Sequence, residues 1–266
     1  IKYNIRKKKC GAKLKLTSEL YLLIYKCIKN RHSPEQISGR LKRNNSIHTI
    51  CTKTIYTWIY KGLIPSISKK NLRRKGKKKV NNETRGKIGG KNISLRPAKV
   101  NTRREIGHWE GDTILGEKSK SALLTLVERK TRFTYFFKLE NKRSYSVQEQ
   151  VKKLYRKLPQ KVFKSITFDN GKEFSRHKEL EEESNLSIYF SNPGCPNERG
   201  TNENTNGLIR QYFPKGTDFG DITQEQVIRV QNILNSRPRK RLGYMTPKEK
   251  FKQLTNLDYN AVALLT

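Results

Sequence analysis

The residues of this sequence best suited to chemistry are three carboxylates, Asp112, Asp169 and Glu203. Asp112 lies within an apolar stretch and Asp169 directly follows another, where an unpaired carboxylate is costly to bury. Glu203 lies in a polar segment with helical spacing, on one helix face with Gly207 and Arg210. This combination of acid, bare backbone and cation suits a metal ion with a phosphate beside it. A polar surface helix is the alternative interpretation of that segment.

Three carboxylates from two strands and one helix predict a site for two hard cations about 4 Å apart, Mg²⁺ or Mn²⁺. Such ions lower the pKa of an attacking water or 3′-hydroxyl and stabilise the leaving oxygen. Attack by water cleaves a strand, and attack by a 3′-hydroxyl on a second duplex transfers one. In the alternative interpretation the carboxylates are only paired with arginines, for which the sequence offers Arg103, Arg104, Arg129 and Arg199.

Other residues near the three carboxylates have weaker claims to the same chemistry. Glu198 competes with Glu203 as third ligand, but it precedes Arg199-Gly200 and is expected to lie outside the helix. Glu110 shares the strand face of Asp112 and is a candidate for supporting that ligand. His108, on the same face, is expected to be structural rather than to position DNA. We assign both tryptophans to the core: Trp58 and Trp109.

The charge of the chain points to a polyanionic partner. Its 266 residues hold 58 Lys and Arg against 23 Asp and Glu, a net charge of +35, with 33% hydrophobic residues. Residues 1–104 carry 30 of the basic residues and 3 of the acids, and residues 105–266 carry 28 and 20. Double-stranded DNA is therefore the expected partner, bound mainly through phosphates and with a steep dependence on salt. The first segment is expected to grip the nucleic acid.

Composition also narrows the setting of the protein. The four cysteines are widely spaced without a C-x-x-C pair, so we expect reduced thiols in a cytosolic protein and no structural zinc. No apolar run approaches the length of a membrane span, and no membrane partner is expected. The chain opens at Ile1 and its single methionine is Met245, so we expect an upstream segment to be missing.

Residues 1–67 are predicted to form a helix-turn-helix domain. Apolar residues from Leu16 to Ile28 recur at helical steps, with Thr17 or Ser18 as N-cap. Ser33-Pro-Glu-Gln36 is a capping box that opens a second helix. A third helix is expected to be capped by Thr52 and to end before Gly62.

The third helix is the expected DNA-reading element. Its inner face is apolar, and its outer face is expected to enter the major groove with the DNA-binding residues Lys53, Thr54, Thr57 and Lys61. A small helical bundle that serves dimerisation is the alternative. Residues 68–104 lack periodicity and are predicted to be a basic, flexible linker. Its phosphate-tracking residues would include Lys75, Lys77, Lys78 and Lys79, although a nuclear-localisation signal has the same composition.

Residues 105–255 are predicted to form one α/β domain, followed by a tail over residues 256–266. Three β-rich runs begin near His108 and continue over 121–127 and 132–139, the first carrying Asp112. A helix over 144–158, a strand over 162–168, a polar helix over 173–184, a strand over 186–190 and the helix of Glu203 follow. This order is that of a ribonuclease-H-like core with a mixed five-stranded sheet.

Four motifs in order carry a resemblance to a known family. They are His108-Trp-Glu-Gly-Asp-Thr-Ile-Leu-Gly116, Asp169-Asn-Gly-Lys-Glu-Phe174, the run from Glu198 to Asp218, and Leu234-Asn-Ser-Arg-Pro-Arg-Lys-Arg-Leu-Gly243 with Thr246-Pro247. With 33 residues between Asp169 and Glu203, the chain from about residue 33 to its end resembles the bacterial insertion-sequence transposases of the IS-thirty family.

The resemblance implies a specific activity. Asp112, Asp169 and Glu203 would be the DDE triad of an integrase catalytic core, binding two Mg²⁺ or Mn²⁺ ions, with Arg210 at the basic position seven residues after the glutamate. The family also implies recognition of terminal inverted repeats, joining to target DNA, and a homodimer or higher multimer that brings both ends together. Its place would be the bacterial cytoplasm, at the nucleoid.

Two departures from the family pattern concern the approach to Glu203. Gly194 and Asn197 stand where family members usually carry aromatic residues, and a further N-terminal helix-turn-helix is absent. Loss of those aromatics would impair the enzyme if they stack on a flipped base or order the loop. A non-enzymatic DNA-binding regulator and a nuclease that cleaves without joining remain as alternative functions.

Overall fold

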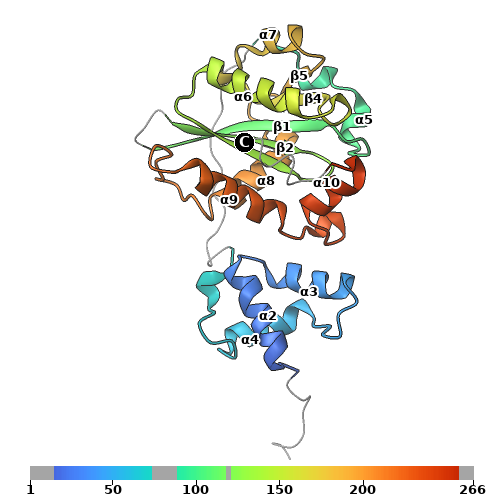
Figure 1. The fold of residues 1–266 in the computed structure, drawn as a ribbon, viewed down its shortest axis with the longest axis vertical. Helices are drawn as coiled ribbons and strands as arrows, with labels where there is room; N and C mark the ends of the chain where they lie inside the picture. Colours follow the sequence, from blue (N-terminus) through green and yellow to red (C-terminus); the bar gives the residue numbers. More distant parts are fainter. Residues whose placement is uncertain (1–14, 74–88, 118–120, 258–266) are drawn as a thin grey trace, which may run out of the picture. The chain divides into compact units, whose positions relative to one another are not determined.

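The computed structural model describes residues 15–73, 89–117 and 121–257 (Figure 1). The chain divides into two compact units, residues 1–78 and 79–266. A separate hydrophobic cluster stabilises the first unit, and two clusters on opposite faces of a sheet stabilise the second. The domain limits expected from the sequence stay predictions.

The first unit is the predicted set of three helices. They are α2 (Ser18–Lys29), α3 (Pro34–Arg43) and α4 (Thr52–Tyr60). Thr17 caps α2, and the predicted capping box opens α3. The apolar faces meet in one core, in which Leu20, Ile24, Ile55 and Trp58 are at most 4% exposed.

The cap of α4 differs from the prediction. Cys51, not Thr52, is the N-cap, and its Sγ accepts a hydrogen bond from the backbone N–H of Thr54 at 3.4 Å. Thiols are weak acceptors, so the sequence pattern favoured the neighbouring threonine. The helix ends before Gly62, which has a φ of +69°. A left-handed residue at this position is a frequent helix terminator.

The predicted linker is folded where the structure describes it. A 3-10 turn spans Lys69–Asn71, another spans Ile93–Leu95, and α5 spans Ala98–Asn101. Arg96 is only 7% exposed and donates to the Thr167 hydroxyl at 2.9 Å. A buried arginine therefore anchors residues 91–104, a segment too poor in apolar residues to show periodicity, and the prediction of a flexible linker stays untested. Lys75, Lys77, Lys78 and Lys79 lie outside the described residues.

The second unit is built on a mixed five-stranded sheet. Its strands are β1 (His108–Leu115), β2 (Ala122–Glu128), β3 (Thr134–Leu139), β4 (Ser165–Phe168) and β5 (Ser187–Phe190). Their order is β3-β2-β1-β4-β5, with β1–β2 and β2–β3 antiparallel and β1–β4 and β4–β5 parallel. This confirms the predicted ribonuclease-H-like core.

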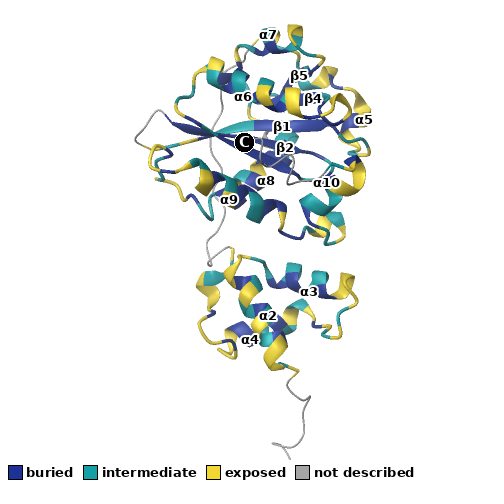
Figure 2. Ribbon diagram, in the orientation of Figure 1, coloured by how far each residue is buried: buried dark blue, intermediate teal, exposed yellow. Residues whose placement is uncertain are grey.

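Helices cover both faces of this sheet (Figure 1). α6 (Ser144–Lys157) and the face containing Trp109 share one apolar cluster. α8 (Gly200–Ile209) and α9 (Gln224–Asn235) form a second apolar cluster with Ile114. Ile114 follows Trp109 by five residues on β1 and therefore lies on the opposite face of the sheet. The strands are accordingly buried on both sides (Figure 2).

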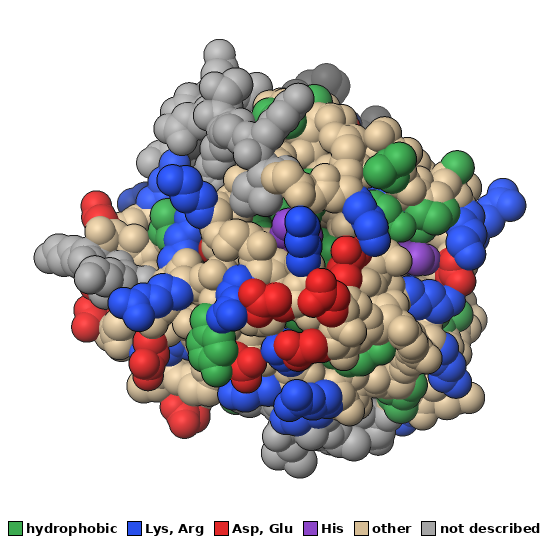
Figure 3. Space-filling view, turned by 90° about the horizontal axis from the view of Figure 1, so that it is seen from above, with side chains coloured by type: hydrophobic (Ala, Val, Ile, Leu, Met, Phe, Trp, Pro, Cys, Tyr) green, Lys and Arg blue, Asp and Glu red, His purple; other side chains and the backbone are tan. Residues whose placement is uncertain are grey.

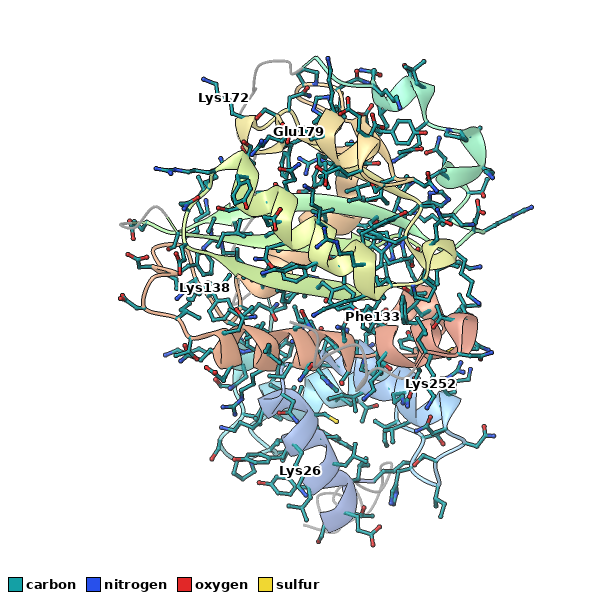
Figure 4. All side chains as sticks on the ribbon, turned by 45° about the horizontal axis from the view of Figure 1, so that its top comes forward. Lys26, Phe133, Lys138, Lys172, Glu179 and Lys252 are labelled. Carbon is teal, nitrogen blue, oxygen red and sulfur yellow. The ribbon has the colours of Figure 1, made fainter. Side chains whose placement is uncertain are left out.

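The remaining helices close the ends of the domain. α10 (Pro247–Thr255) is fixed by Phe251, whose ring stacks on Phe133 with centroids 4.4 Å apart. Phe133 is labelled in Figure 4. The predicted helix over 173–184 is a 3-10 turn at Lys172–Phe174 followed by α7 (His177–Glu182). Among the described residues, no helix combines the length and apolar composition that crossing a bilayer requires.

Acidic side chains gather among lysines and arginines on the face seen from above in Figure 3. α7 lies at this end of the domain (Figure 1). Glu179 pairs with Arg176 at 2.9 Å, and Glu181 pairs with Lys91 at 2.9 Å. The acids of this helix are therefore partly neutralised by neighbouring cations.

Candidate active site

Asp112 and Asp169 are brought together by the register of two parallel strands. Glu110 of β1 lies beside Thr167 of β4. Asp112 and Asp169 each lie two residues after this pair, so they fall at the same level of the sheet and on the same face. Their side chains are 19% and 11% exposed. The fold thus holds two carboxylates side by side at the edge of solvent.

Hydrogen bonds fix the orientation of both carboxylates. Asp112 accepts from the backbone N–H of Thr113 at 2.9 Å through Oδ1, and from the Asn206 amide at 2.8 Å through Oδ2. Asp169 Oδ1 accepts from the backbone N–H of Gly171 at 3.0 Å. Each aspartate is thereby oriented by N–H donors.

Arg199 is the cation shared by this pair. Its Nη1 lies 3.6 Å from Asp112 Oδ2, and its Nη2 lies 3.3 Å from Asp169 Oδ2. Arg199, one of the arginines that the sequence offered as partners, therefore does pair with both aspartates. Of the other candidates, Arg129 pairs instead with Glu110.

Glu110 anchors the start of the helix that carries Glu203. Its carboxylate is fully buried, 2.9 Å from Arg129 Nε, and it accepts from the backbone N–H groups of Thr201 and Asn202 at 2.9 Å each. The first N–H groups of a helix lack partners within it and favour negative charge. Glu110 is thus a supporting residue that positions α8 against β1.

Asn202 and Asn206 complete the contact between α8 and the sheet. Asn202 is fully buried and donates to the backbone carbonyls of Glu110 and Thr125 at 3.0 and 3.3 Å. Asn206, one turn later, holds Asp112. Sequence reasoning missed both asparagines because polar residues on a helix are expected to face water. Their four-residue spacing, with Ile209 following, was the available signal.

Glu203 lies in the first turn of α8. It is exposed, as is Gly207, so the predicted face of acid and bare backbone is at the surface. Within the described ranges, no group of three or more His, Cys, Asp or Glu residues is placed to share one metal ion. The structure joins the two aspartates through Arg199, and the assignment of Glu203 as third ligand stays a prediction.

Glu198 is used by the loop before α8. It precedes the helix in a 3-10 turn over Pro196–Arg199, as expected, and accepts from the backbone N–H of Asn192 at 2.7 Å and from its amide at 2.9 Å. Its role as a third ligand has no support in this arrangement. The Glu198 carboxylate instead stabilises the loop between Asn192 and the start of α8.

Arg210 ties the end of α8 to the sheet. Its guanidinium donates to the carbonyls of Pro214 at 3.0 Å and Leu115 at 3.2 Å, and burial lowers its pKa. Contact with DNA stays a prediction for this residue. In the first unit, Lys53 and Lys61 are exposed and Thr54 and Thr57 are half-buried on α4.

His108 and Trp109 are structural, as expected. His108 is 7% exposed, with Nδ1 2.8 Å from the Ser165 hydroxyl and Nε2 3.2 Å from Glu105. Burial lowers the pKa of His108. Trp109 is fully buried and donates to the Val162 carbonyl at 2.9 Å.

The aspartate pair fits a divalent cation. Carboxylate oxygens are the ligands that Mg²⁺ and Mn²⁺ prefer. Two carboxylates at one level of adjacent strands repel each other unless a cation lies close to both. In this structure the guanidinium of Arg199 supplies such a charge.

Comparisons with known proteins identify relatives of this chain. The integrase core domain family matches residues 102–196. The transposase for insertion sequence element IS4351 of Bacteroides fragilis is 41% identical over 264 residues, covering 97% of this chain and 80% of that protein. The transposase InsI for element IS30C of Escherichia coli K12 is 39% identical over 241 residues, and the match spans 85% of this chain and 63% of the relative's length.

A solved structure, the catalytic core domain of BIV integrase, matches 56% of this chain and 95% of its own at 17% identity and a TM-score of 0.45. The fold assignment rests on the strand order and on the integrase core match, not on this likeness. The identity to the insertion-sequence proteins confirms the family predicted from the motifs. The chain belongs to the insertion-sequence transposases of the IS30 family.

Proposed function

We propose that this chain recognises the terminal inverted repeats of its own element, cleaves DNA strands there and joins them to target DNA. The observation that carries the proposal is the pair Asp112 and Asp169 at one level of two parallel strands. The catalytic residues are this pair and Glu203, on the helix that Glu110 anchors to the same strand. Two carboxylates held side by side in a chain of net charge +35 support a role in metal-dependent chemistry on DNA.

The reaction is two successive displacements at phosphorus. Water attacks the phosphodiester, a new P–O bond forms, and the bond to the 3′ oxygen breaks to leave a 3′-hydroxyl. That hydroxyl then attacks a target phosphorus, forms the joining bond and displaces the target's own 3′ oxygen. Asp112, Asp169 and Glu203 would hold two Mg²⁺ or Mn²⁺ ions, which activate the attacking oxygen and stabilise the leaving one.

Binding and assembly follow from the basic regions. Lys53, Thr54 and Thr57 of α4 would contact the inverted repeat, together with Lys61 at the C-cap of this helix. The lysines over 75–79, with Arg210, would contact phosphates. Both element ends must meet for joining, so the active form would be a homodimer or higher multimer. Its place would be the cytoplasm of a bacterium, on the nucleoid.

The proposal is tested with a labelled duplex that carries the inverted repeat flanking the gene, in the presence of Mg²⁺. Asp112→Asn, Asp169→Asn and Glu203→Gln should each reduce cleavage on the order of 10³-fold, about 4 kcal/mol of transition-state stabilisation, while DNA binding persists. Asp221→Asn is the matched control, since Asp221 is exposed in the loop before α9. Near-normal cleavage by any of the three variants would show that the triad assignment is wrong.

A second function is favoured by one observation, the pairing of both aspartates with Arg199. A DNA-binding regulator would use such pairs only for stability. Binding without any strand breakage, in wild type and Asp169→Asn alike, would support it. Nicking without joined products would indicate a nuclease instead.

A further inference from the structure

The guanidinium of Arg199 occupies a position defined by three segments of the second unit. Besides Asp112 and Asp169, it donates to the Gly111 carbonyl at 3.2 Å and to the Ser191 hydroxyl at 3.3 Å. These partners lie on β1, directly after β4 and directly after β5. The side chain is 14% exposed. Arg199 therefore ties together the strand ends that present the carboxylates.

The contacts of Arg199 with the aspartates are ion pairs of loose geometry. At 3.3 and 3.6 Å they are longer than the 2.7–2.9 Å typical of charge-assisted hydrogen bonds. A cation held this way neutralises both carboxylates without saturating either. The guanidinium therefore holds the two carboxylates together, and a cation that binds them more tightly can replace it.

We propose that Arg199 is a positioning residue that holds Asp112 and Asp169 together before metal binds and competes with the metal for them. The inference rests on the proposed function, because it takes the two aspartates as metal ligands. A divalent ion and a guanidinium at one carboxylate pair repel each other. Binding of the ion must therefore displace Arg199 from the pair or overcome its repulsion.

Two opposite effects of removing the guanidinium follow from this competition. The metal-free protein should lose stability, because two carboxylates are left facing each other. The metal should bind more tightly, because its competitor is gone. A side chain with a purely structural role would show the first effect only, and its loss would weaken metal binding or leave it unchanged.

The experiment is a titration of the full chain with MnCl₂ in the absence of DNA, measured by isothermal titration calorimetry. Arg199→Gln should bind Mn²⁺ about tenfold more tightly than wild type. Its melting temperature without metal should fall by roughly 4 °C and recover at saturating Mn²⁺. Arg199→Lys keeps the charge and should stay within about threefold of the wild-type affinity.

Two control variants make the outcomes separable. Arg156→Gln removes the same charge from the exposed side of α6, across the sheet, and should leave Mn²⁺ affinity unchanged. Asp169→Asn should abolish the binding. If wild type and Asp169→Asn bind alike, the metal assignment of the proposed function is wrong. If Asp169→Asn alone loses binding and Arg199→Gln binds no more tightly than wild type, the inference about Arg199 is wrong while the proposed function stands.

Discussion

Glu110 shows how a single buried acid can position the elements around the candidate site. Its carboxylate is shared between the guanidinium of Arg129 and the first N–H groups of α8. All these groups are buried, so none of them gains compensation from water. The position of α8, and with it Asn206 and Glu203, depends on this one charge.

Replacing this acid should be costly. Glu110→Gln leaves Arg129 buried without an anionic partner and should lower the free energy of unfolding by about 3 kcal/mol in urea denaturation. Glu182→Gln, on an exposed site of α7, should change it by less than about 0.5 kcal/mol. The double variant with Arg129→Met should recover part of the loss. Equal stability of Glu110→Gln and Glu182→Gln would contradict the anchoring role.

Glu105 and His108 make stability depend on pH. Hydrogen bonds from Lys164 and His108 lower the pKa of Glu105 from 4.5 to about 2, and burial lowers the pKa of His108 below 6.5. Both groups therefore take up protons more readily in the unfolded chain, so acidification favours unfolding. The melting temperature should fall first below about pH 6.5 and again below pH 4.5.

The variant Glu105→Gln isolates the lower of these two steps. Glu105 is about one-third exposed, so solvent screens its ion pairs and its removal should cost no more than about 1 kcal/mol at neutral pH. That difference from wild type should shrink as the pH falls from 4.5 towards 2. Melting curves at pH 7, 5.5, 4 and 3 measure it. A difference that grows on acidification would contradict the lowered pKa of Glu105.

The elements were predictable where apolar residues mark them. Each strand of the sheet coincides with an apolar run of the sequence, and capping residues mark the starts of α2 and α3. The segment over 91–104 was not predictable, because a buried arginine and scattered apolar residues hold it. Asp112 and Asp169 stand out in the sequence because acids are rare inside strands, and the structure brings these two together. Contacts between distant polar groups, such as Asn206 with Asp112 and Glu110 with α8, leave no periodic signal.

β1 needs a glycine beside Asp112. A Cβ at Gly111 would lie 2.2 Å from a ring carbon of Phe168 and 3.2 Å from Leu126. Gly111→Ala should therefore force β1 away from β4, cost about 1–3 kcal/mol and reduce cleavage by separating Asp112 from Asp169. Gly200→Ala is the matched control, since a Cβ there meets nothing within 4 Å. Its stability should be unchanged or slightly higher, and similar stability of both variants in thermal melts would contradict the packing argument.

At the scale of the whole molecule, the basic and acidic residues are distributed unevenly along the chain. Residues 1–104 are almost free of acids, and residues 105–266 hold 20 of the 23. Such a division suits a protein that must attract a polyanion and still keep acids in its active site. The attraction is expected to come from cations that need no fixed structure, since counterion release depends on the number of phosphates neutralised.

The lysines over 75–79 give this idea a direct test. Replacing Lys75, Lys77, Lys78 and Lys79 by alanine should weaken binding equally for inverted-repeat and unrelated duplexes, because phosphate contacts carry no sequence information. The slope of log K against log salt should fall by about 0.9 for each phosphate that the variant no longer neutralises. A control with alanine at four exposed lysines of the second unit, Lys153, Lys157, Lys161 and Lys178, removes the same charge and should change the slope less. A weakening confined to the inverted repeat would show instead that this run reads bases.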